Sequence, residues 1–283
     1  MVTLTSYLMK FGFVLPNNWG LPDPLVIGDL AAEAEELGLE SVWVNHHVLN
    51  IGYIADRLDD RPYYDALTTL TWVAARTERV RLGTSVLVLP YLHPMVLAKT
   101  LATLDQLSGG RVIAGLGVGS LAEENAAMRV EYERRGPWSD EFIEVMLALW
   151  SDGPGSFEGD HFAMSGLVAS PKPAQNDLEI WIGGSGAPAR KRAARFGQAW
   201  HPLTSVGGLA KRMPKMIDTL EAAGRSRNDL IVAPRITVDA VPDMASVEAW
   251  AAAGADQLII GTTGDDIDVI RQGLAHVGAL AKG

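Results

Sequence analysis

The order of apolar and polar segments along the chain predicts a regular alternation of strands and helices. Short apolar runs, typical of buried strands, alternate with segments whose apolar positions recur at helical spacing. Strands are expected at residues 10–16, 39–45, 80–90, 111–119, 178–186, 198–202, 230–239 and 255–261. Helices are expected at 23–37, 62–78, 94–110, 139–150, 187–197, 207–224, 244–252 and from about 265 onward.

This series of eight strand–helix units predicts an α/β fold, the (β/α)8 TIM barrel. An open, doubly wound sheet is the alternative. No linker rich in Pro, Gly or Ser divides the 283 residues, so a single TIM-barrel domain over 1–283 is expected. The regular pattern lapses at about 120–177, which predicts an insertion after the fourth strand, with a small hairpin at 156–164. Residues 1–8 are expected to form a flexible N-terminal extension.

Composition excludes several classes of function. The net charge is −10 and the basic residues form no block, which argues against nucleic acid as a partner. The chain contains no cysteine, so disulfides, thiolate metal sites and a cysteine nucleophile are excluded. No signal peptide is evident, and no apolar run reaches the roughly 18 residues of a membrane span. A cytoplasmic protein without a membrane partner is therefore expected.

Two adjacent histidines follow the second predicted strand. TIM-barrel active sites lie at the carboxyl ends of the strands, which is where His46 and His47 are expected. An imidazole that titrates near neutral pH can act as an acid or a base there. Since strand residues alternate between faces, at most one of the two is expected to point at the centre. The alternative is that they only hydrogen-bond neighbouring loops.

Two glycine-rich segments follow other predicted strands. GLGVGS (115–120) and GGSG (183–186) allow backbone N–H groups to approach a phosphate, and the second segment opens a helix. Each alone is equally explained by a tight turn. Together they predict a site for a phosphate-bearing tail. The G-x-G-x-x-G, H-x-x-x-H and G-x-S-x-G patterns are absent, which argues against a nicotinamide site, a metal site and a serine hydrolase.

Four segments resemble a known family. SVWVNHH (41–47), TERVRLGTSVLVLPYLHP (77–94), GRVIAGLGVGS (110–120) and IWIGGSG (180–186) are similar to the luciferase-like monooxygenase superfamily, in its branch of coenzyme F420-dependent oxidoreductases. The resemblance extends over nearly the whole chain from Met9. It implies a TIM barrel that is usually a homodimer and holds a deazaflavin ring at the mouths of the strands. The implied cofactor is F420, with FMN as the alternative.

The resemblance also implies the site residues. A non-proline cis peptide at Ser85-Val86 would back the ring, and His47 would be the acid or base, with Glu123 as a second catalytic candidate. The implied cofactor-binding residues are His46, His47, Thr84, Ser85, Val86, Gly117, Gly119, Ser120, Gly184, Ser185 and Gly186. No metal ligand is expected. His46 stands where the family often has an acidic residue, and Ser120 stands where its sugar-phosphate dehydrogenases have Glu, so that specific activity is not implied.

The resemblance implies an enzyme that moves a hydride between F420 and an organic small molecule that the sequence does not identify. One alternative is an FMN-dependent monooxygenase that uses O2 and reduced flavin supplied by a flavin reductase. A second alternative is a deazaflavin-binding protein without catalysis. The segment 48–61 and the insertion are expected to shape the substrate pocket.

Overall fold

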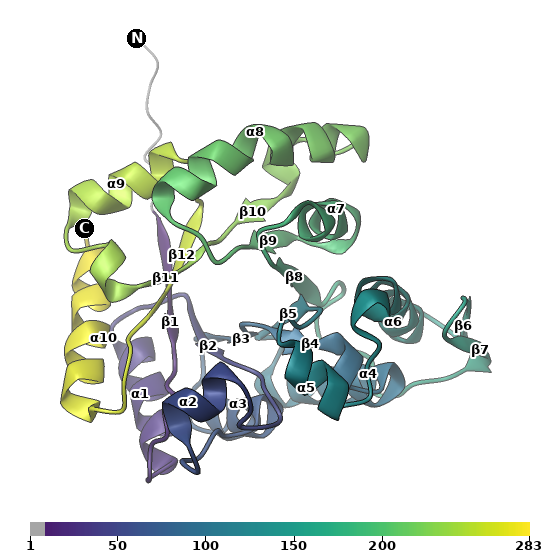
Figure 1. The fold of residues 1–283 in the computed structure, drawn as a ribbon, viewed down its shortest axis with the longest axis horizontal. Coiled ribbons are helices and arrows are strands. Elements are labelled where there is room, and N and C mark those ends of the chain that lie inside the picture. Colours follow the sequence, from purple (N-terminus) through teal and green to yellow (C-terminus); the bar gives the residue numbers. More distant parts are fainter. Residues whose placement is uncertain (1–8) are drawn as a thin grey trace.

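The computed structural model describes residues 9–283, so the extension expected at 1–8 lies outside the described residues. Strands and helices alternate along the chain (Figure 1). The strands are β1 (Lys10–Val14), β2 (Ser41–Val44), β3 (Arg81–Thr84), β4 (Leu87–Val88), β5 (Val112–Gly117), β6 (Gly155–Glu158), β7 (Ala163–Leu167), β8 (Glu179–Gly183), β9 (Ala199–His201), β10 (Ile231–Val232), β11 (Arg235–Thr237) and β12 (Gln257–Gly261). The α-helices are α1 (Leu25–Glu36), α2 (Tyr53–Leu58), α3 (Ala66–Ala74), α4 (Pro94–Ser108), α5 (Ala122–Ala127), α6 (Arg135–Trp150), α7 (Ala187–Phe196), α8 (Val206–Ala222), α9 (Met244–Ala252) and α10 (Ile267–Ala281).

The main sheet is parallel and strongly curled. Its strands follow the order β10-β9-β8-β5-β3-β2-β1-β12-β11, and the short β4 also pairs with β5. Helices surround the strands on the outside of the curl (Figure 1). The strands at the two ends of this order, β10 and β11, are consecutive in the chain. The predicted α/β class and its strand–helix alternation are confirmed.

The strand predicted at 230–239 is interrupted. Pro234 separates β10 from β11, because proline has no N–H to donate to a neighbouring strand. Ala233 N–H donates to the Trp200 carbonyl over 2.9 Å, whereas the Pro234 carbonyl accepts from Ile259 N–H over 3.1 Å. One half of the segment therefore pairs with β9 and the other half with β12.

The strand predicted at 80–90 is interrupted as well. Its two parts, β3 and β4, are separated by a cis peptide bond between Ser85 and Val86, which confirms the geometry implied by the resemblance. Thr84 Oγ1 donates to the Gly115 carbonyl of β5 over 2.8 Å. A Cβ at Gly115 would overlap the Thr84 carbonyl, so only glycine lets β5 pass this close.

Helix boundaries differ from the prediction where a polar side chain sets them. α3 begins at Ala66 rather than Pro62, because the Asp65 side chain accepts from Thr68 N–H over 2.8 Å and caps the helix. α6 begins before Ser139, whose hydroxyl donates to the Arg135 carbonyl within the helix instead of capping it. The short helix α2 was not predicted and lies within 48–61.

The chain between β5 and β8 departs from a simple strand–helix unit. It contains α5, α6 and an antiparallel hairpin of β6 and β7 that is separate from the main sheet. The hairpin confirms the prediction for 156–164. His161, at its turn, is exposed and stacks on Trp138 with ring centroids 4.0 Å apart.

A small cluster of large side chains fills the inside of the curled sheet. Trp43 of β2 and Trp181 of β8 are fully buried there, with ring centroids 4.5 Å apart. A Cβ at Gly83 on the neighbouring β3 would overlap the Trp43 ring, so glycine makes room for the indole. A larger core packs between the sheet and the helices. The two tryptophans therefore close the inside of the sheet below the carboxyl ends of the strands.

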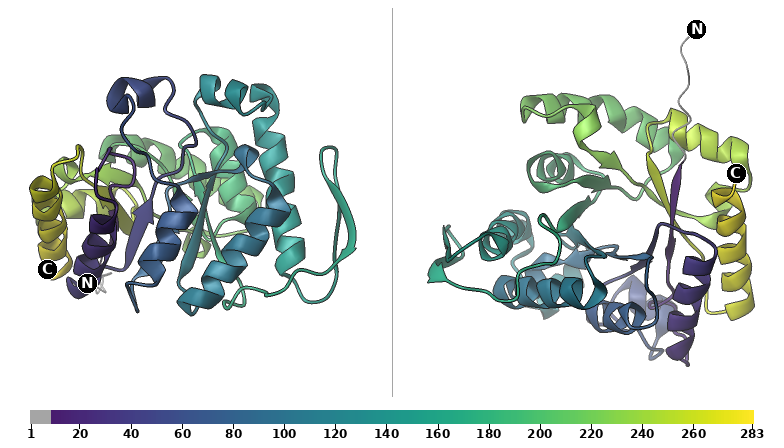
Figure 2. Two further views of the ribbon diagram at one scale, coloured as in Figure 1. Left: turned by 90° about the horizontal axis from the view of Figure 1, so that it is seen from below. Right: turned by 180° about the vertical axis from the view of Figure 1, so that it is seen from behind.

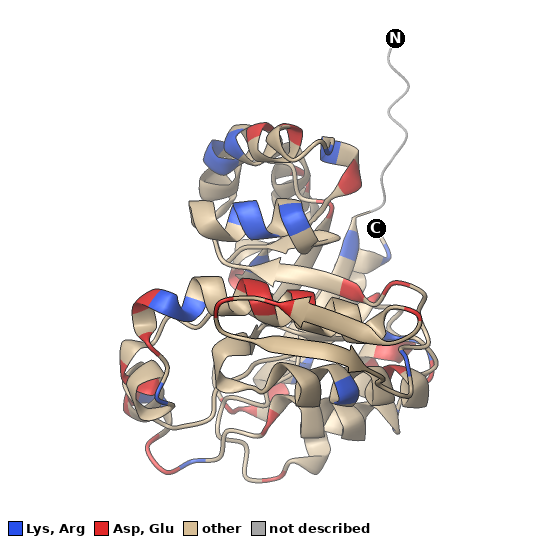
Figure 3. Ribbon diagram, turned by 90° about the vertical axis from the view of Figure 1, so that its right-hand side faces the viewer, with Lys and Arg blue, Asp and Glu red and all other residues tan. Residues whose placement is uncertain are grey.

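The surface carries both signs of charge. Acidic and basic residues are interspersed along the ribbon in Figure 3, consistent with the absence of a basic block in the sequence. In the part of the chain that the structure describes, no helix combines the length and the apolar character needed to cross a membrane.

Candidate active site

A cavity of about 500 Å³ lies at the carboxyl ends of the strands. This volume is within the range of pockets that hold cofactors and small molecules. The helices α2 and α5, which follow β2 and β5, stand together at this end of the molecule (Figure 2, left). The predicted site residues that line it are His46, His47, Ser85, Val86, Gly117, Gly119, Ser120 and Gly184.

His47 is held by a buried carboxylate. Its Nδ1 lies 2.5 Å from Glu124 Oε2, while the other oxygen, Glu124 Oε1, accepts from Val48 N–H over 2.7 Å and Leu49 N–H over 3.1 Å. The Nε2 of His47 lies 3.2 Å from the Tyr53 hydroxyl. The carboxylate therefore fixes the orientation of the ring and leaves Nε2 on the side of the cavity and Tyr53.

Glu124 is fully buried and still favours its charged form. Burial alone would raise the pKa of its carboxyl, but the hydrogen bonds from His47, Val48 and Leu49 outweigh burial and lower the pKa below its ordinary value. An ionised carboxylate only accepts hydrogen bonds, so Nδ1 of His47 carries the proton in this pair. Neutral His47 then has its free lone pair on Nε2.

The carboxylate expected to be catalytic, Glu123, is placed elsewhere. It is exposed on α5 and does not line the cavity, whereas the adjacent Glu124 points inward. Consecutive residues of a helix are about 100° apart, so only one of the two can face His47. The structure therefore brings Glu124, and not the predicted Glu123, into contact with His47.

His46 has a different environment from its neighbour. It is buried, and its Nδ1 accepts from Val88 N–H over 3.1 Å. Burial lowers the pKa of His46 to about 4, so the ring is neutral at physiological pH. The proton of a neutral ring is then on Nε2. The two rings have different hydrogen-bond partners, and both line the cavity, although at most one of them was expected to point at its centre.

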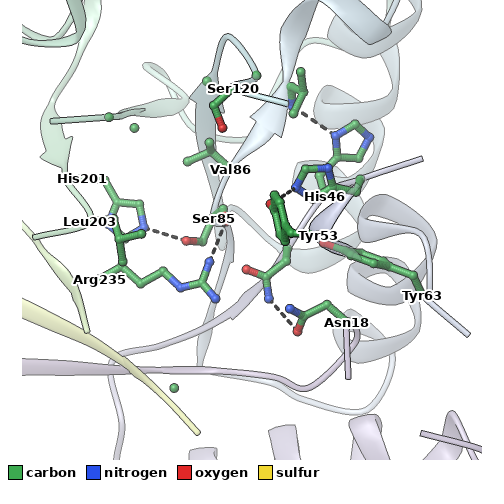
Figure 4. A pocket seen from close by; sticks show the side chains of 18 of the residues that line it. Asn18, His46, Tyr53, Tyr63, Ser85, Val86, Ser120, His201, Leu203 and Arg235 are labelled. Atoms are coloured by element: carbon green, nitrogen blue, oxygen red, sulfur yellow. Dashed lines mark hydrogen bonds between the residues drawn. The ribbon is translucent and has the colours of Figure 1, made fainter. Parts of the chain in front are cut away.

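His201 lies across the cavity from the histidine pair and contacts the Ser85-Val86 segment. Its Nδ1 is 2.6 Å from the Ala233 carbonyl and its Nε2 is 2.8 Å from Ser85 Oγ (Figure 4). A carbonyl can only accept, so Nδ1 donates and Nε2 accepts from the serine hydroxyl. Burial lowers the pKa of His201 to about 4. The ring stacks on Trp43 with centroids 5.3 Å apart.

Glycines let the backbone pack against Val86. A Cβ at Gly117 would overlap Val86 Cγ2, and a Cβ at Gly119 would lie 2.7 Å from Val88 Cγ1. Gly119 also has φ +74°, a conformation that other residues rarely adopt. These positions have a packing reason to be glycine, and they also leave the backbone at the cavity wall uncovered.

Three predicted cofactor-binding residues do not line this cavity. Thr84 is buried and its hydroxyl is engaged by the Gly115 carbonyl. Ser185 donates through Oγ to the Leu203 carbonyl over 2.7 Å. Gly186 is exposed and precedes α7 as its N-cap. Their binding roles remain predictions.

Several lining residues were not singled out from the sequence. Tyr53 and Arg57 come from α2, Tyr63 from the segment that follows it, and Arg235 from β11. Arg235 carried a signal, since it is a charged residue inside the apolar segment LIVAPRITVD (230–239). The sequence of α2 gives little indication of a helix, because six residues make too few turns to show a helical period. No cluster of three or more His, Asp or Glu side chains suited to a metal ion occurs within residues 9–283.

Comparison with known proteins identifies the family. The model of the luciferase-like monooxygenase family matches residues 9–281. The chain is also 32% identical over 238 residues to a protein of Kineococcus radiotolerans named F420-dependent glucose-6-phosphate dehydrogenase, a match that covers 81% of this chain and 68% of the relative. The chain belongs to the luciferase-like family.

Solved structures share the fold at low sequence identity. An F420-dependent secondary alcohol dehydrogenase, in complex with an F420-acetone adduct, superposes with a TM-score of 0.81 and 20% identity over 96% of this chain and 98% of that one. A monooxygenase from Streptomyces bottropensis has a TM-score of 0.79 and 21% identity, over 97% of this chain and 98% of that one. At these identities the likeness establishes the fold alone.

Proposed function

We propose that this protein is an oxidoreductase that transfers a hydride between coenzyme F420 and a small organic substrate. The observation that carries the proposal is the His47–Glu124 pair at the cavity, in which Glu124 occupies Nδ1 of His47 and leaves Nε2 as the acceptor nitrogen. Relatives named for F420 dependence support the choice of cofactor. The same relatives and the structural neighbours differ in what their names say they act on, so the substrate is left open.

The cavity wall suits a flat ring with a polar tail. Val86 offers an aliphatic surface, and Gly117 and Gly119 leave backbone N–H groups uncovered where a larger residue would block approach. The Nε2–H of neutral His46 is a donor at the cavity, since its Nδ1 is already occupied by Val88. Ser120 adds a hydroxyl to the same wall. These residues would hold the cofactor, which supplies the hydride chemistry when bound.

His47 would manage the proton that accompanies hydride transfer. When a substrate alcohol is oxidised, neutral Nε2 accepts the hydroxyl proton, and the ionised Glu124 stabilises the resulting imidazolium. In the reverse direction the imidazolium returns the proton. Tyr53 donates to Nε2 in the resting site, because burial raises the pKa of its phenol and keeps the proton on oxygen. Glu124 takes over the role assigned from the sequence to Glu123.

The remaining structural expectations complete the proposal. We infer that the curled sheet is a closed (β/α)8 barrel in one domain, with β10 and β11 as the two halves of its seventh strand. Residues 120–177, with α5, α6 and the β6–β7 hairpin, would be the insertion after the fourth barrel strand. A homodimer and a cytoplasmic location also remain predictions.

Fluorescence titration of the purified protein with oxidised F420, beside an equal titration with FMN, tests the proposal. Saturable binding of F420 with no comparable binding of FMN is expected. Preference for FMN would favour a monooxygenase, and O2 uptake that depends on reduced FMN and a flavin reductase would establish that activity. Tight F420 binding with no turnover of alcohols, aldehydes or sugar phosphates would favour a binding protein. Binding of neither cofactor would contradict all three functions.

A further inference from the structure

The cavity is lined by cationic side chains and by no acidic one. Arg57 and Arg235 line it, whereas neither Asp nor Glu is among the lining residues of the described chain. The protein as a whole has the opposite balance, with 34 acidic and 24 basic residues. A concentration of positive charge in a concave site favours anionic ligands.

Arg57 is held in place without being neutralised. Its Nη2 donates to the Asn18 carbonyl over 2.9 Å, and its guanidinium lies over the Trp19 ring, 4.4 Å from the centroid. Its Nε is buried and has no hydrogen-bond partner among residues 9–283. Within the same range, no carboxylate oxygen lies within 4.0 Å of it.

Arg235, on β11, is in a similar state. In the described chain its guanidinium makes one hydrogen bond, from Nη1 to the Ser85 carbonyl over 3.2 Å, and forms no ion pair. Burial lowers the pKa of Arg235, and the nearby charge of Arg57 acts in the same direction, although the group remains cationic. The two charges therefore repel each other, and within residues 9–283 neither is paired with a carboxylate.

A second buried donor without a partner, besides Arg57 Nε, lies near the two arginines. The hydroxyl of Tyr63 is buried and has no partner in the described part of the chain. Figure 4 shows Tyr63 and Tyr53 extending into the cavity from the side opposite Arg235. Burial raises the pKa of Tyr63, so its hydroxyl keeps its proton and can donate. Buried donors without acceptors are uncommon in folded proteins and indicate a missing partner.

Arg111 shows how this protein satisfies an arginine that has a structural role. It is buried, and its guanidinium donates to Ser108, Thr77, Val80 and Ala74 at 2.8–3.0 Å. The chain thus provides acceptors where an arginine supports the fold. Within residues 9–283 the guanidinium groups of Arg57 and Arg235 each have a single acceptor, which distinguishes the cavity pair from a structural arginine.

We propose that Arg57 and Arg235, with the Tyr63 hydroxyl, bind an anionic group of the substrate, a carboxylate or a phosphate. The guanidinium fork matches the geometry of both groups. Tyr53 lies one turn before Arg57 on α2, and its hydroxyl is 3.2 Å from His47 Nε2. An anion held by the arginines would therefore place the adjoining part of the substrate beside the proton-transfer group. That the anion belongs to a substrate rests on the proposed function, whereas the anion site itself does not.

The test is isothermal titration with inorganic phosphate and with acetate at constant ionic strength, on the free protein and on the F420-loaded protein. Variants Arg57→Gln and Arg235→Gln are compared with the wild type, and Arg235→Lys keeps the charge while losing the fork. Arg79→Gln, which removes an exposed charge at the far end of β3, is the control. F420 affinity is measured for every variant, and far-ultraviolet circular dichroism and unfolding in urea verify that each is folded.

The expected result is saturable anion binding by the wild type, weakened about tenfold or more in both Gln variants and less in Arg235→Lys. Arg79→Gln should match the wild type, and F420 affinity should change by no more than a few-fold. If the Gln variants lose F420 affinity instead, the arginines bind the cofactor and the proposal is wrong. Absence of saturable anion binding by folded wild type also overturns it. Failure of F420 binding alone, with anion binding intact in free protein, would refute the proposed function and leave the anion site standing.

Discussion

The two walls of the cavity use histidine in opposite ways. On one wall His47 is partly exposed and has the ionised Glu124 at 2.5 Å. On the other wall His201 is buried between the Ala233 carbonyl and Ser85, and the nearest cationic group on that side, Arg235, lowers its pKa further. Both rings lie at carboxyl ends of parallel strands. Their chemistry differs because Nδ1 of His47 contacts a carboxylate, whereas Nδ1 of the buried His201 contacts a backbone carbonyl.

This difference separates a proton carrier from a fixed element of the wall. A carboxylate partner stabilises an imidazolium, so His47 can gain and release a proton during turnover. Burial keeps the His201 ring neutral and outweighs the hydrogen bond to the Ala233 carbonyl, which acts in the opposite direction on its pKa, so His201 accepts from Ser85 and holds it in place. Position at a strand end is thus insufficient to identify a catalytic histidine.

The largest expected effect comes from removing the proton carrier. His47→Ala should lower kcat by roughly a hundredfold or more, because general acid–base groups contribute at least that much. F420 affinity should change little. Stopped-flow measurement of F420 reduction, with an alcohol or sugar phosphate that supports turnover, checks this. His201→Asn is the comparison, and it should retain most of the activity. Equal losses in both variants would remove the distinction between the walls.

The second prediction concerns stability against pH. In folded protein burial lowers the pKa of His201 from 6.5 to about 4, so between these values the unfolded chain binds a proton that the folded one does not. The free energy of unfolding should therefore fall as the pH falls through this window, by about 2 kcal/mol per such histidine between pH 7 and pH 5. Above pH 7 this contribution is constant.

Urea unfolding at a series of pH values measures this dependence. His201→Asn should have a shallower dependence than the wild type, whatever its stability at pH 7. His161→Gln, at the exposed turn of the hairpin, is the control and should keep the wild-type slope. An unchanged slope in His201→Asn would show that the buried ring is not the group that resists protonation. His46, which is also buried with a pKa of about 4, should contribute to the remaining slope.

The third prediction tests the carboxylate that distinguishes the two walls. Glu124→Gln keeps the shape of the side chain but removes its charge, and should lower kcat about tenfold while leaving F420 affinity near the wild-type value. Glu124→Asp should recover part of the loss. Glu123→Gln is the matched control, because Glu123 is the exposed neighbour on the same helix. A larger loss in Glu123→Gln than in Glu124→Gln would restore the original sequence prediction.

The fold was largely predictable because it depends on local patterns. Apolar runs and helix caps placed the strand–helix alternation, and errors occurred where a single residue intervened. Pro234 interrupts one strand, and Asp65 moves the start of α3. These residues act through one missing or one added hydrogen bond. A hydrophobic pattern averages over such details.

The site was only partly predictable, since it depends on which side chains meet across the fold. His47 was identified from its place after a strand, but its carboxylate partner is 77 residues away in the chain. The choice between Glu123 and Glu124 depends on the rotation of α5, which no local pattern fixed. Arg57 comes from a six-residue helix without a clear period. Contacts between distant segments are fixed by packing, and sequence periodicity does not record them.

The smallest expected effect concerns the contact between the Trp19 ring and the Arg57 guanidinium. Trp19 lies under the Arg57 guanidinium, and a cation–π contact of this kind contributes about 0.5–1 kcal/mol at a partly exposed site. Trp19→Leu should therefore weaken phosphate binding only about two- to fivefold, against the larger loss in Arg57→Gln. Trp72→Leu is the matched control, because Arg76 lies over the Trp72 ring on the surface, away from the cavity.

Two outcomes would change this interpretation. If Trp19→Leu weakened phosphate binding as much as Arg57→Gln, the indole would contact the bound ligand directly instead of only orienting the arginine. If both tryptophan variants bound phosphate like the wild type, the position of Arg57 would depend on its hydrogen bond to the Asn18 carbonyl.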